Sequence, residues 1–364
     1  MWMRKRISYK EHDPVENSND RQQGYAWQKE NVKKIDGVYH LVDEGILSRK
    51  DYSVLFQNDT GKHILPAETT DTLNVYSNVN FTSSFFSFIG RKHIVLNIFN
   101  THGELIGSFI PCDDHNSGTT MLKQARIYLD PVLRNEFART MECSSLNEII
   151  ENIRYYQYHY HIKELKEIAD RVKGLIKKLD NTEDISEMMS IEAKARQLYY
   201  SGFNYMILDD SFSFSSRSKR PPKDPINAMI SFGNIWLYNR IATEIYKTTL
   251  DIRIGFVHST NRRNQTLNLD IADIYKPAIV DRAILSLINT HRIDAKEHFC
   301  TVRKDGVYLN NEGKRIFLGE LENKLYKRRN IKGNSMTYDF AIKKEIQGIL
   351  HAVLHERNYQ SVLH

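Results

Sequence analysis

A carboxylate stands on the apolar face of one predicted helix. Residues 185–200 have helical periodicity, and Glu192 lies seven residues after Ile185 and four after Met188, on the face that these two side chains share. A carboxylate directed into the interior must be paired, protonated or bound to a metal, because desolvating an unpaired charge costs on the order of several kcal/mol. The pattern by itself favours an ion pair with Arg196, one helical turn further on, over a metal site.

A second polar group follows the short apolar run at residues 254–257. His258 comes directly after this run, and Asp270 and Asp273 are three residues apart, on one face of the helical turn expected there. An imidazole and carboxylates suit Mn²⁺ or Mg²⁺ in an oxygen-rich site. Considered one at a time, these three residues are better explained by structural roles than by metal binding. Asp270 would then be a helix N-cap, Asp273 its first-turn partner and His258 a loop histidine with satisfied hydrogen bonds.

Basic residues flank this segment and are candidates for contacts with phosphate groups. One cluster lies beside a rigid Pro-Pro pair, and a second pair follows His258 in a polar loop. Lysine and arginine neutralise phosphates, although a run of charge is more often a solvated surface. The candidate DNA-binding residues are Arg217, Lys219, Arg220, Lys223, Arg262 and Arg263. Asp281 and Arg282, adjacent in the chain, are interpreted as an interhelical or surface salt bridge.

The composition is that of an ordinary globular protein. The 364 residues are 41% hydrophobic and carry a formal net charge of +6, which weakly favours an anionic partner. Three widely spaced cysteines form neither a disulfide framework nor a zinc motif. The basic start of the chain lacks the apolar stretch of a signal peptide, and the most apolar segments are too short to cross a bilayer. We therefore expect a cytoplasmic protein without a membrane partner.

Two halves of the chain have different periodicities, which predicts an α+β fold. Residues 1–35 form a polar N-terminal extension. Residues 36–112 contain short apolar runs separated by turn residues and predict a small, sandwich-like β-rich domain. Residues 113–120 are the predicted linker. Helical periodicity then extends through residues 121–364, which predicts a larger, all-α C-terminal domain.

Three separated motifs give the chain a recognisable signature. The segments at residues 220–239, 254–282 and 305–317 occur in the order and at the spacing found in one family. They resemble the CRISPR-associated adaptation integrase/endonuclease family, the larger of the two universal spacer-acquisition proteins. The amino-acid sequence of these segments looks most like that of members from type I-B systems. The resemblance covers about residues 36–355, and the order of a β-rich and a helical domain agrees with it.

The resemblance implies a ligand set and a reaction. Glu192, His258 and Asp273 would be both the catalytic residues and the ligands of Mg²⁺ or Mn²⁺, and Asp270 would support the site. Many members have Glu at the position of Asp273, and many have Gly-Asn where this chain has Ala193-Lys194. The implied reaction is insertion of new spacers into a CRISPR array by transesterification, in which a DNA 3′-hydroxyl attacks a repeat phosphodiester. DNA cleavage would accompany it.

The resemblance also implies partners. These are double-stranded and single-stranded DNA (prespacer and CRISPR repeat), a small ferredoxin-like adaptation protein and a second copy of the chain. The copies would pair through the β-rich domain, which would carry no catalytic residue. Two alternatives remain open: a stand-alone metal-dependent nuclease for branched or single-stranded DNA, and a non-catalytic DNA-binding scaffold.

Overall fold

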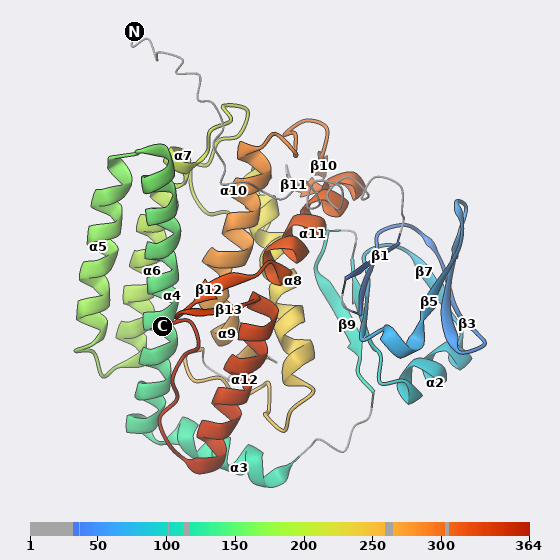
Figure 1. Ribbon diagram of the computed structural model, residues 1–364, viewed down its shortest axis with the longest axis horizontal. Helices are drawn as coiled ribbons and strands as arrows, with labels where there is room; N and C mark the ends of the chain where they lie inside the picture. The colour runs from blue at the N-terminus through green and yellow to red at the C-terminus, as the bar shows by residue number, and fades with distance from the viewer. Residues whose placement is uncertain (1–31, 36, 101, 112–116, 259–264, 303–305) are drawn as a thin grey trace.

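A computed structural model describes residues 32–35, 37–100, 102–111, 117–258, 265–302 and 306–364. Most of the predicted N-terminal extension, together with Arg262 and Arg263, lies outside the described residues. The β-rich part and the helical part lie side by side, and the long helix α8 runs close to the strands of the first part (Figure 1). The predicted order of a strand-rich region followed by a mostly helical region is confirmed.

The β-rich domain consists of two sheets that share a core with one short helix. A five-stranded sheet has the order β1-β2-β6-β8-β9, and a four-stranded sheet has the order β5-β4-β3-β7. Alternate side chains of each sheet point inward. Leu47 and Phe56 of one sheet pack with Leu73 and Leu96 of the other and with Phe85 of helix α2. The elements are β1 (Val32–Ile35), β2 (Val38–Leu41), β3 (Gly45–Lys50), β4 (Ser53–Asn58), β5 (Gly61–Pro66), β6 (Thr72–Val75), β7 (Val79–Phe81), α2 (Ser83–Arg91), β8 (Val95–Phe99) and β9 (Leu105–Phe109).

The helical domain contains two short hairpins that the sequence did not predict. β10 (Phe299–Val302) pairs with β11 (Gly306–Leu309), and β12 (Arg329–Ile331) pairs with β13 (Asn334–Met336). The first helix, α3, begins at Gly118, inside the segment predicted as linker. The helices are α3 (Gly118–Leu129), α4 (Pro131–Tyr160), α5 (Glu164–Leu179), α6 (Ile185–Ser201), α7 (Phe203–Met206), α8 (Pro225–Ile245), α9 (Leu267–Lys276), the π-helical turn η3 (Pro277–Asp281), α10 (Arg282–Asn289), α11 (Asn311–Tyr326) and α12 (Tyr338–His355).

Aspartate caps fix where two of the longest helices begin. The Asp130 carboxylate accepts hydrogen bonds from the amides of Val132 and Leu133, and Pro131 occupies the first helical position of α4. Asp224 caps α8 in the same manner, with Pro225 following it. A side-chain cap satisfies amides that have no partner within the helix, and proline fits there because its missing N–H would be unpaired anyway. These local signals set the start of α8, the helix that borders the site.

The two domains are docked through an apolar contact and buried polar pairs. The Tyr76 ring stacks on Phe99 and lies against Phe232 of α8, with ring centroids 4.5 and 5.6 Å away. Gly103, with φ +83°, sits so close to Phe232 that a Cβ atom would lie 2.4 Å from its ring. Buried His40 Nε2 lies 2.8 Å from Glu322 Oε1 of α11. The β-rich domain is thereby held against α8 and α11.

The C-terminal segment folds back over the helical domain. The buried carboxylate of Glu345 accepts hydrogen bonds from the Tyr275 hydroxyl and the Val362 amide, both 2.9 Å long. Burial raises the pKa of Glu345 to about 7.

Among the described residues, no helix is both long and apolar enough to cross a membrane.

Candidate metal and DNA site

One large cleft collects the three candidate metal ligands that the sequence singled out. It has a volume of about 1540 Å³, and Glu192, His258 and Asp273 all line it. Glu192 comes from α6, His258 from the segment before α9, and Asp273 from α9 itself. Helix α6 and the distant segment that ends in α9 thus bring the three predicted ligands to one cleft.

Asp270 organises the backbone that presents His258. One of its carboxylate oxygens, Oδ2, accepts hydrogen bonds from the amides of Phe256 (2.6 Å) and Val257 (3.0 Å), and the other, Oδ1, accepts one from the amide of His258 (3.0 Å). The fit is tight, because a Cβ atom on Gly255 would lie 2.5 Å from Asp270 Oδ2. Asp270 is therefore not the N-cap that the structural interpretation proposed. The N-cap position of α9 belongs to Thr266.

The same carboxylate sets the orientation of the imidazole. His258 Nδ1 lies 2.7 Å from Asp270 Oδ1, and Nε2 lies 3.9 Å from Asp273 Oδ2. A carboxylate accepts hydrogen bonds, so Nδ1 carries a ring proton, and Nε2 is the ring nitrogen directed toward Asp273. A carboxylate that orients a histidine in this way is common behind metal-bound imidazoles.

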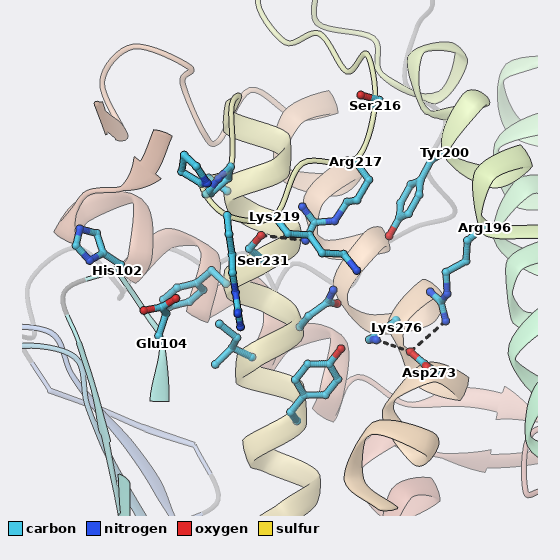
Figure 2. A pocket seen from close by; sticks show the side chains of 18 of the residues that line it. His102, Glu104, Arg196, Tyr200, Ser216, Arg217, Lys219, Ser231, Asp273 and Lys276 are labelled. Carbon is cyan, nitrogen blue, oxygen red and sulfur yellow. Dashed lines mark hydrogen bonds and ion pairs between the residues drawn. The ribbon is translucent and has the colours of Figure 1, made fainter. Parts of the chain in front are cut away.

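Two cations pair with the carboxylates of the candidate ligands Glu192 and Asp273. The Arg196 guanidinium pairs through Nε with Glu192 and through a terminal nitrogen with Asp273 Oδ1, at 3.1 Å. Lys276 pairs with the same oxygen of Asp273, as Figure 2 shows. Burial opposes ionisation of Asp273, but Lys276, Arg196 and His258 outweigh burial and hold the pKa of its carboxyl well below the usual range. The Glu192–Arg196 pair is the interaction that the sequence pattern favoured.

The donor set fits a hard divalent cation, but its carboxylates are already paired with Arg196 and Lys276. Two carboxylates and an oriented imidazole are the ligands expected for Mg²⁺ or Mn²⁺. As the side chains stand, no three His, Cys, Asp or Glu residues in the described part of the chain are grouped closely enough to hold an ion. Arg196 pairs with both carboxylates, and Lys276 pairs with that of Asp273.

Another acid lies beside the candidate ligands. Glu142, on α4, is buried, and one of its carboxylate oxygens has no hydrogen-bond partner in the described structure. Burial raises the pKa of Glu142 well above its usual range, and the negative charges of Glu192 and Asp273 raise it further. No sequence pattern indicated this neighbour, which reaches the site through the packing of α4 against α9.

Asp281 is not the salt-bridge partner of Arg282 that the sequence suggested. Arg282 donates to Asn152 Oδ1 at 3.0 Å and stacks over the Tyr155 ring. Both oxygens of buried Asp281 lack a hydrogen bond of good geometry among the described residues. Burial raises the pKa of Asp281 to about 6. The residue ends a π-helical turn, a feature frequent near functional sites.

The first basic cluster forms one wall of the cleft. Arg217, Lys219 and Arg220 line it, whereas Lys223 is exposed and is not among the lining residues. Arg217 is held in place by Asn227 Oδ1 (2.7 Å) and Ser231 Oγ (2.9 Å). Burial lowers the pKa of Lys219, and the nearby charges of Arg217 and Lys276 lower it further. Positive charge is therefore concentrated along this wall.

The β-rich domain also contributes to the cleft, which sequence reasoning missed. His102 and Glu104, from the turn between β8 and β9, line it, and Figure 2 shows them across from Asp273. The His102 ring lies 4.5 Å from the ring of Tyr308 on β11. The Asn-Thr-His-Gly sequence at residues 100–103 is typical of a tight turn, but nothing local indicates what such a turn will face.

Comparison with known proteins decides the family. The model of the family "CRISPR associated protein Cas1" matches residues 39–323. The chain belongs to the Cas1 family. A relative from Thermodesulfovibrio yellowstonii, CRISPR-associated endonuclease Cas1 2, is 36% identical over 323 residues, which are 88% of this chain and 97% of the relative. The CRISPR-associated endonuclease Cas1 of Thermotoga maritima is 36% identical over 291 residues, 80% of this chain and 88% of the relative.

Solved structures agree with this Cas1 assignment. The Cas1 protein of Thermotoga maritima superposes with a TM-score of 0.79 at 33% identity, covering 89% of this chain and 99% of that one. A casposase bound to an integration product gives a TM-score of 0.78 at 18% identity, covering 88% of this chain and 91% of that one. The second likeness shows a shared fold alone. The resemblance found in the sequence is confirmed, and the chain is a member of a family of CRISPR-associated endonucleases.

Proposed function

We propose that this Cas1-family chain is a metal-dependent DNA integrase and endonuclease that inserts spacers into a CRISPR array. The observation that carries the proposal is a single cleft that joins two acidic residues and an oriented imidazole to a wall of fixed positive charge. The acids and the imidazole suit a divalent cation, and the positive wall suits a phosphate backbone. The fold shared with a casposase bound to an integration product supports strand transfer in particular.

The roles of the chain's own residues follow from their contacts. Glu192, His258 and Asp273 would hold Mg²⁺ or Mn²⁺, which when bound polarises the scissile phosphodiester as a Lewis acid. Asp270 keeps His258 Nε2 directed at the site through its hydrogen bond to Nδ1. In integration the nucleophile is the 3′-hydroxyl of the incoming DNA, and in cleavage it is water. The protein therefore needs no nucleophilic side chain, and its main task is to align the strands.

The basic wall would bind DNA before any reaction. Arg217, Lys219 and Arg220 face the cleft and would contact phosphates of both single-stranded and double-stranded segments. Arg262, Arg263 and Lys223 remain further candidates for the same role. Since Arg217 is pinned by Asn227 and Ser231, its guanidinium is pre-positioned and loses little side-chain entropy on binding.

An integration assay tests this function directly. Full-length protein, its small adaptation partner, Mn²⁺ or Mg²⁺ and a supercoiled plasmid carrying a repeat should give joined spacer–plasmid products. Glu192→Ala should give none. Cleaved DNA without joined products would favour the stand-alone nuclease. No reaction with any divalent cation would favour the non-catalytic scaffold.

The partners of this chain form a second part of the proposal. A Cas6-RT-Cas1–Cas2 complex shares the fold at a TM-score of 0.77 and 20% identity, and we infer that this chain also assembles with a small, ferredoxin-like adaptation protein. We further propose a cytoplasmic homodimer formed through the β-rich domain. The outer face of the four-stranded sheet exposes Ile46 and Ile64, with Leu55 paired opposite Ile64.

Disrupting that face should separate the copies. Ile64 lies on this apolar face and is 55% exposed. Ile64→Asp places a charge there, so the variant should be a monomer whose domain remains folded. Sedimentation velocity measures the change. Ile106→Asp, on the outer strand of the other sheet and 69% exposed, is the matched control and should remain dimeric. A dimer that persists in Ile64→Asp would contradict this face as the interface.

A further inference from the structure

Exposed aromatic rings gather at the C-terminal end of α4. Tyr155 and Tyr158 are 44% and 77% exposed, and His159 is exposed beside them. The centroid of the His159 ring lies 4.4 Å from that of Tyr155 and 5.6 Å from that of Tyr158. A single exposed ring is ordinary on a protein surface, whereas contiguous exposed rings mark a contact surface. We call Tyr155, Tyr158 and His159 the aromatic strip.

Cations lie beside the aromatic strip. The Arg282 guanidinium lies 5.4 Å from the centroid of the Tyr155 ring and is held there by a hydrogen bond to Asn152 Oδ1. Arg154 is half-exposed, and the acid that it contacts, Glu151, is the last one on α4. The final turns of the helix therefore present rings and positive charge, and no carboxylate follows them before the helix ends.

A hairpin of the same domain is also strongly basic. Residues 327–337, which contain β12 and β13, hold four cations and no acid. Lys327 and Arg328 are exposed, and the one isoleucine of the hairpin, Ile331, is buried. The side chains that this hairpin offers to solvent are thus basic or polar. We call Lys327, Arg328, Arg329 and Lys332 the basic hairpin.

The end of the chain joins the basic hairpin to the face of α4 that carries the aromatic strip. Lys332 Nζ donates to the Ser361 carbonyl at 3.1 Å, and His364 Nε2 lies 2.9 Å from Glu148 Oε1 on α4. Glu148 and Tyr155 are seven residues apart, which places them on one face of the helix and about 10 Å apart along its axis. In Figure 1 the hairpin and the C-terminus lie over α4. The strip and the hairpin therefore belong to one surface.

The chemistry of this surface matches an unpaired nucleic-acid strand. Exposed rings stack on bases of any type, and lysine and arginine neutralise the phosphates between those bases. The core of a protein–protein contact would also offer aliphatic side chains, but Ile153 and Ile331, the isoleucines of the two segments, are buried. In a duplex the bases are already stacked, so the rings would have no free base to receive. The surface therefore favours single-stranded over double-stranded DNA.

We propose that the aromatic strip and the basic hairpin form a second DNA site, which binds single-stranded DNA outside the catalytic cleft. None of their residues is among those that line the cleft. The inference goes beyond the proposed function and rests on it only in taking DNA as the ligand. A strand held on this surface leaves the cleft free for the DNA end that reacts.

Affinity for labelled oligo(dT) tests the surface in the full-length protein, with EDTA present to prevent cleavage. Fluorescence anisotropy should show binding about tenfold weaker when Tyr155→Ala and Tyr158→Ala are combined, because two stacking rings are lost. Affinity for a blunt duplex should stay within about twofold. The pair Tyr155→Phe and Tyr158→Phe keeps the rings and should bind as the wild type does. Tyr52→Ala is the matched control, since Tyr52 is 77% exposed but lies in the β-rich domain.

The basic hairpin is tested through salt. Lys327→Gln combined with Arg328→Gln removes two phosphate contacts, so the slope of log affinity for oligo(dT) against log salt should flatten by about 1.4. An unchanged slope would exclude the hairpin from the site. This arm leaves α4 untouched and therefore decides the matter even if the tyrosine variants fold poorly.

Photocrosslinking locates the strand on the wild-type protein. Oligonucleotides carrying 5-bromodeoxyuridine should crosslink to Tyr155, Tyr158 or His159 as well as to residues of the cleft. Crosslinks confined to the cleft, or unchanged oligo(dT) affinity without the two tyrosines, would overturn the second site and leave the proposed function intact. If the tyrosine variant kept its DNA affinity but lost the small adaptation protein, the strip would be a protein contact and the inference wrong. Absence of DNA binding in every protein tested would overturn the proposed function as well.

Discussion

Asp273→Asn should abolish strand transfer and cleavage while leaving DNA bound. The substitution keeps the size of the side chain but removes the charge that faces His258 Nε2 and pairs with Arg196 and Lys276. Loss of one charged group that stabilises the transition state costs about a hundredfold to a thousandfold in rate, and loss of a metal ligand should cost at least as much. DNA affinity should be unchanged or higher, because one negative charge leaves the cleft.

Two measurements on the same protein check this separation. Product formation on a repeat-bearing plasmid reports the reaction, and fluorescence anisotropy with labelled DNA at several salt concentrations reports binding. Asp251→Asn is the matched control, since Asp251 pairs with exposed Arg253 and is not among the residues lining the cleft. Strand transfer by Asp273→Asn within threefold of the control would refute Asp273 as a ligand. A parallel loss of DNA binding would instead indicate a damaged fold.

Sequence patterns predicted most helices and strands, because the residues that mark such an element lie close together in the chain. Helical spacing placed Glu192 one turn before Arg196, and the Asp-Pro pairs that begin α4 and α8 are signals of the same local kind. Those signals depend on residues within four positions of each other. The strand-rich first domain followed in the same way from alternating side chains and turn residues.

The site was harder to predict, because its contacts join distant residues. Asp270 looked like a helix cap, yet it reaches back 12 residues to orient His258, which requires the close approach that Gly255 permits. Glu142 lies 50 positions before Glu192, and no periodicity connects them. The resemblance to a family supplied the grouping of Glu192, His258 and Asp273 that the residues alone did not favour. It did not supply Glu142, which only packing revealed, and packing also corrected the pairing expected for Asp281.

The buried ion pairs of Arg240 should dominate the stability of the helical domain. Arg240, on α8, donates to Glu244 Oε1 at 2.7 Å, and its other terminal nitrogen pairs with Asp339 of α12 and lies 3.3 Å from the Tyr326 hydroxyl of α11. Its side chain is 8% exposed. Removing one partner of a buried network leaves charges without a counterion, which costs about 3–5 kcal/mol. Arg240→Met should therefore destabilise the protein by this amount.

Thermal unfolding measures the effect. For a domain of this size, each kcal/mol shifts the midpoint by about 2–4 °C, so Arg240→Met should lower Tm by roughly 10 °C. Lys247 pairs with Glu244, and Lys343 pairs with Asp339. These two pairs remain in Arg240→Met and offset part of the lost stability. The matched control is Arg253→Met, which removes a surface pair whose arginine side chain is 67% exposed and should shift Tm by about 2 °C or less. Equal shifts for the two variants would mean that the buried network contributes no more than a surface pair, and that apolar packing alone joins α8 to α11 and α12.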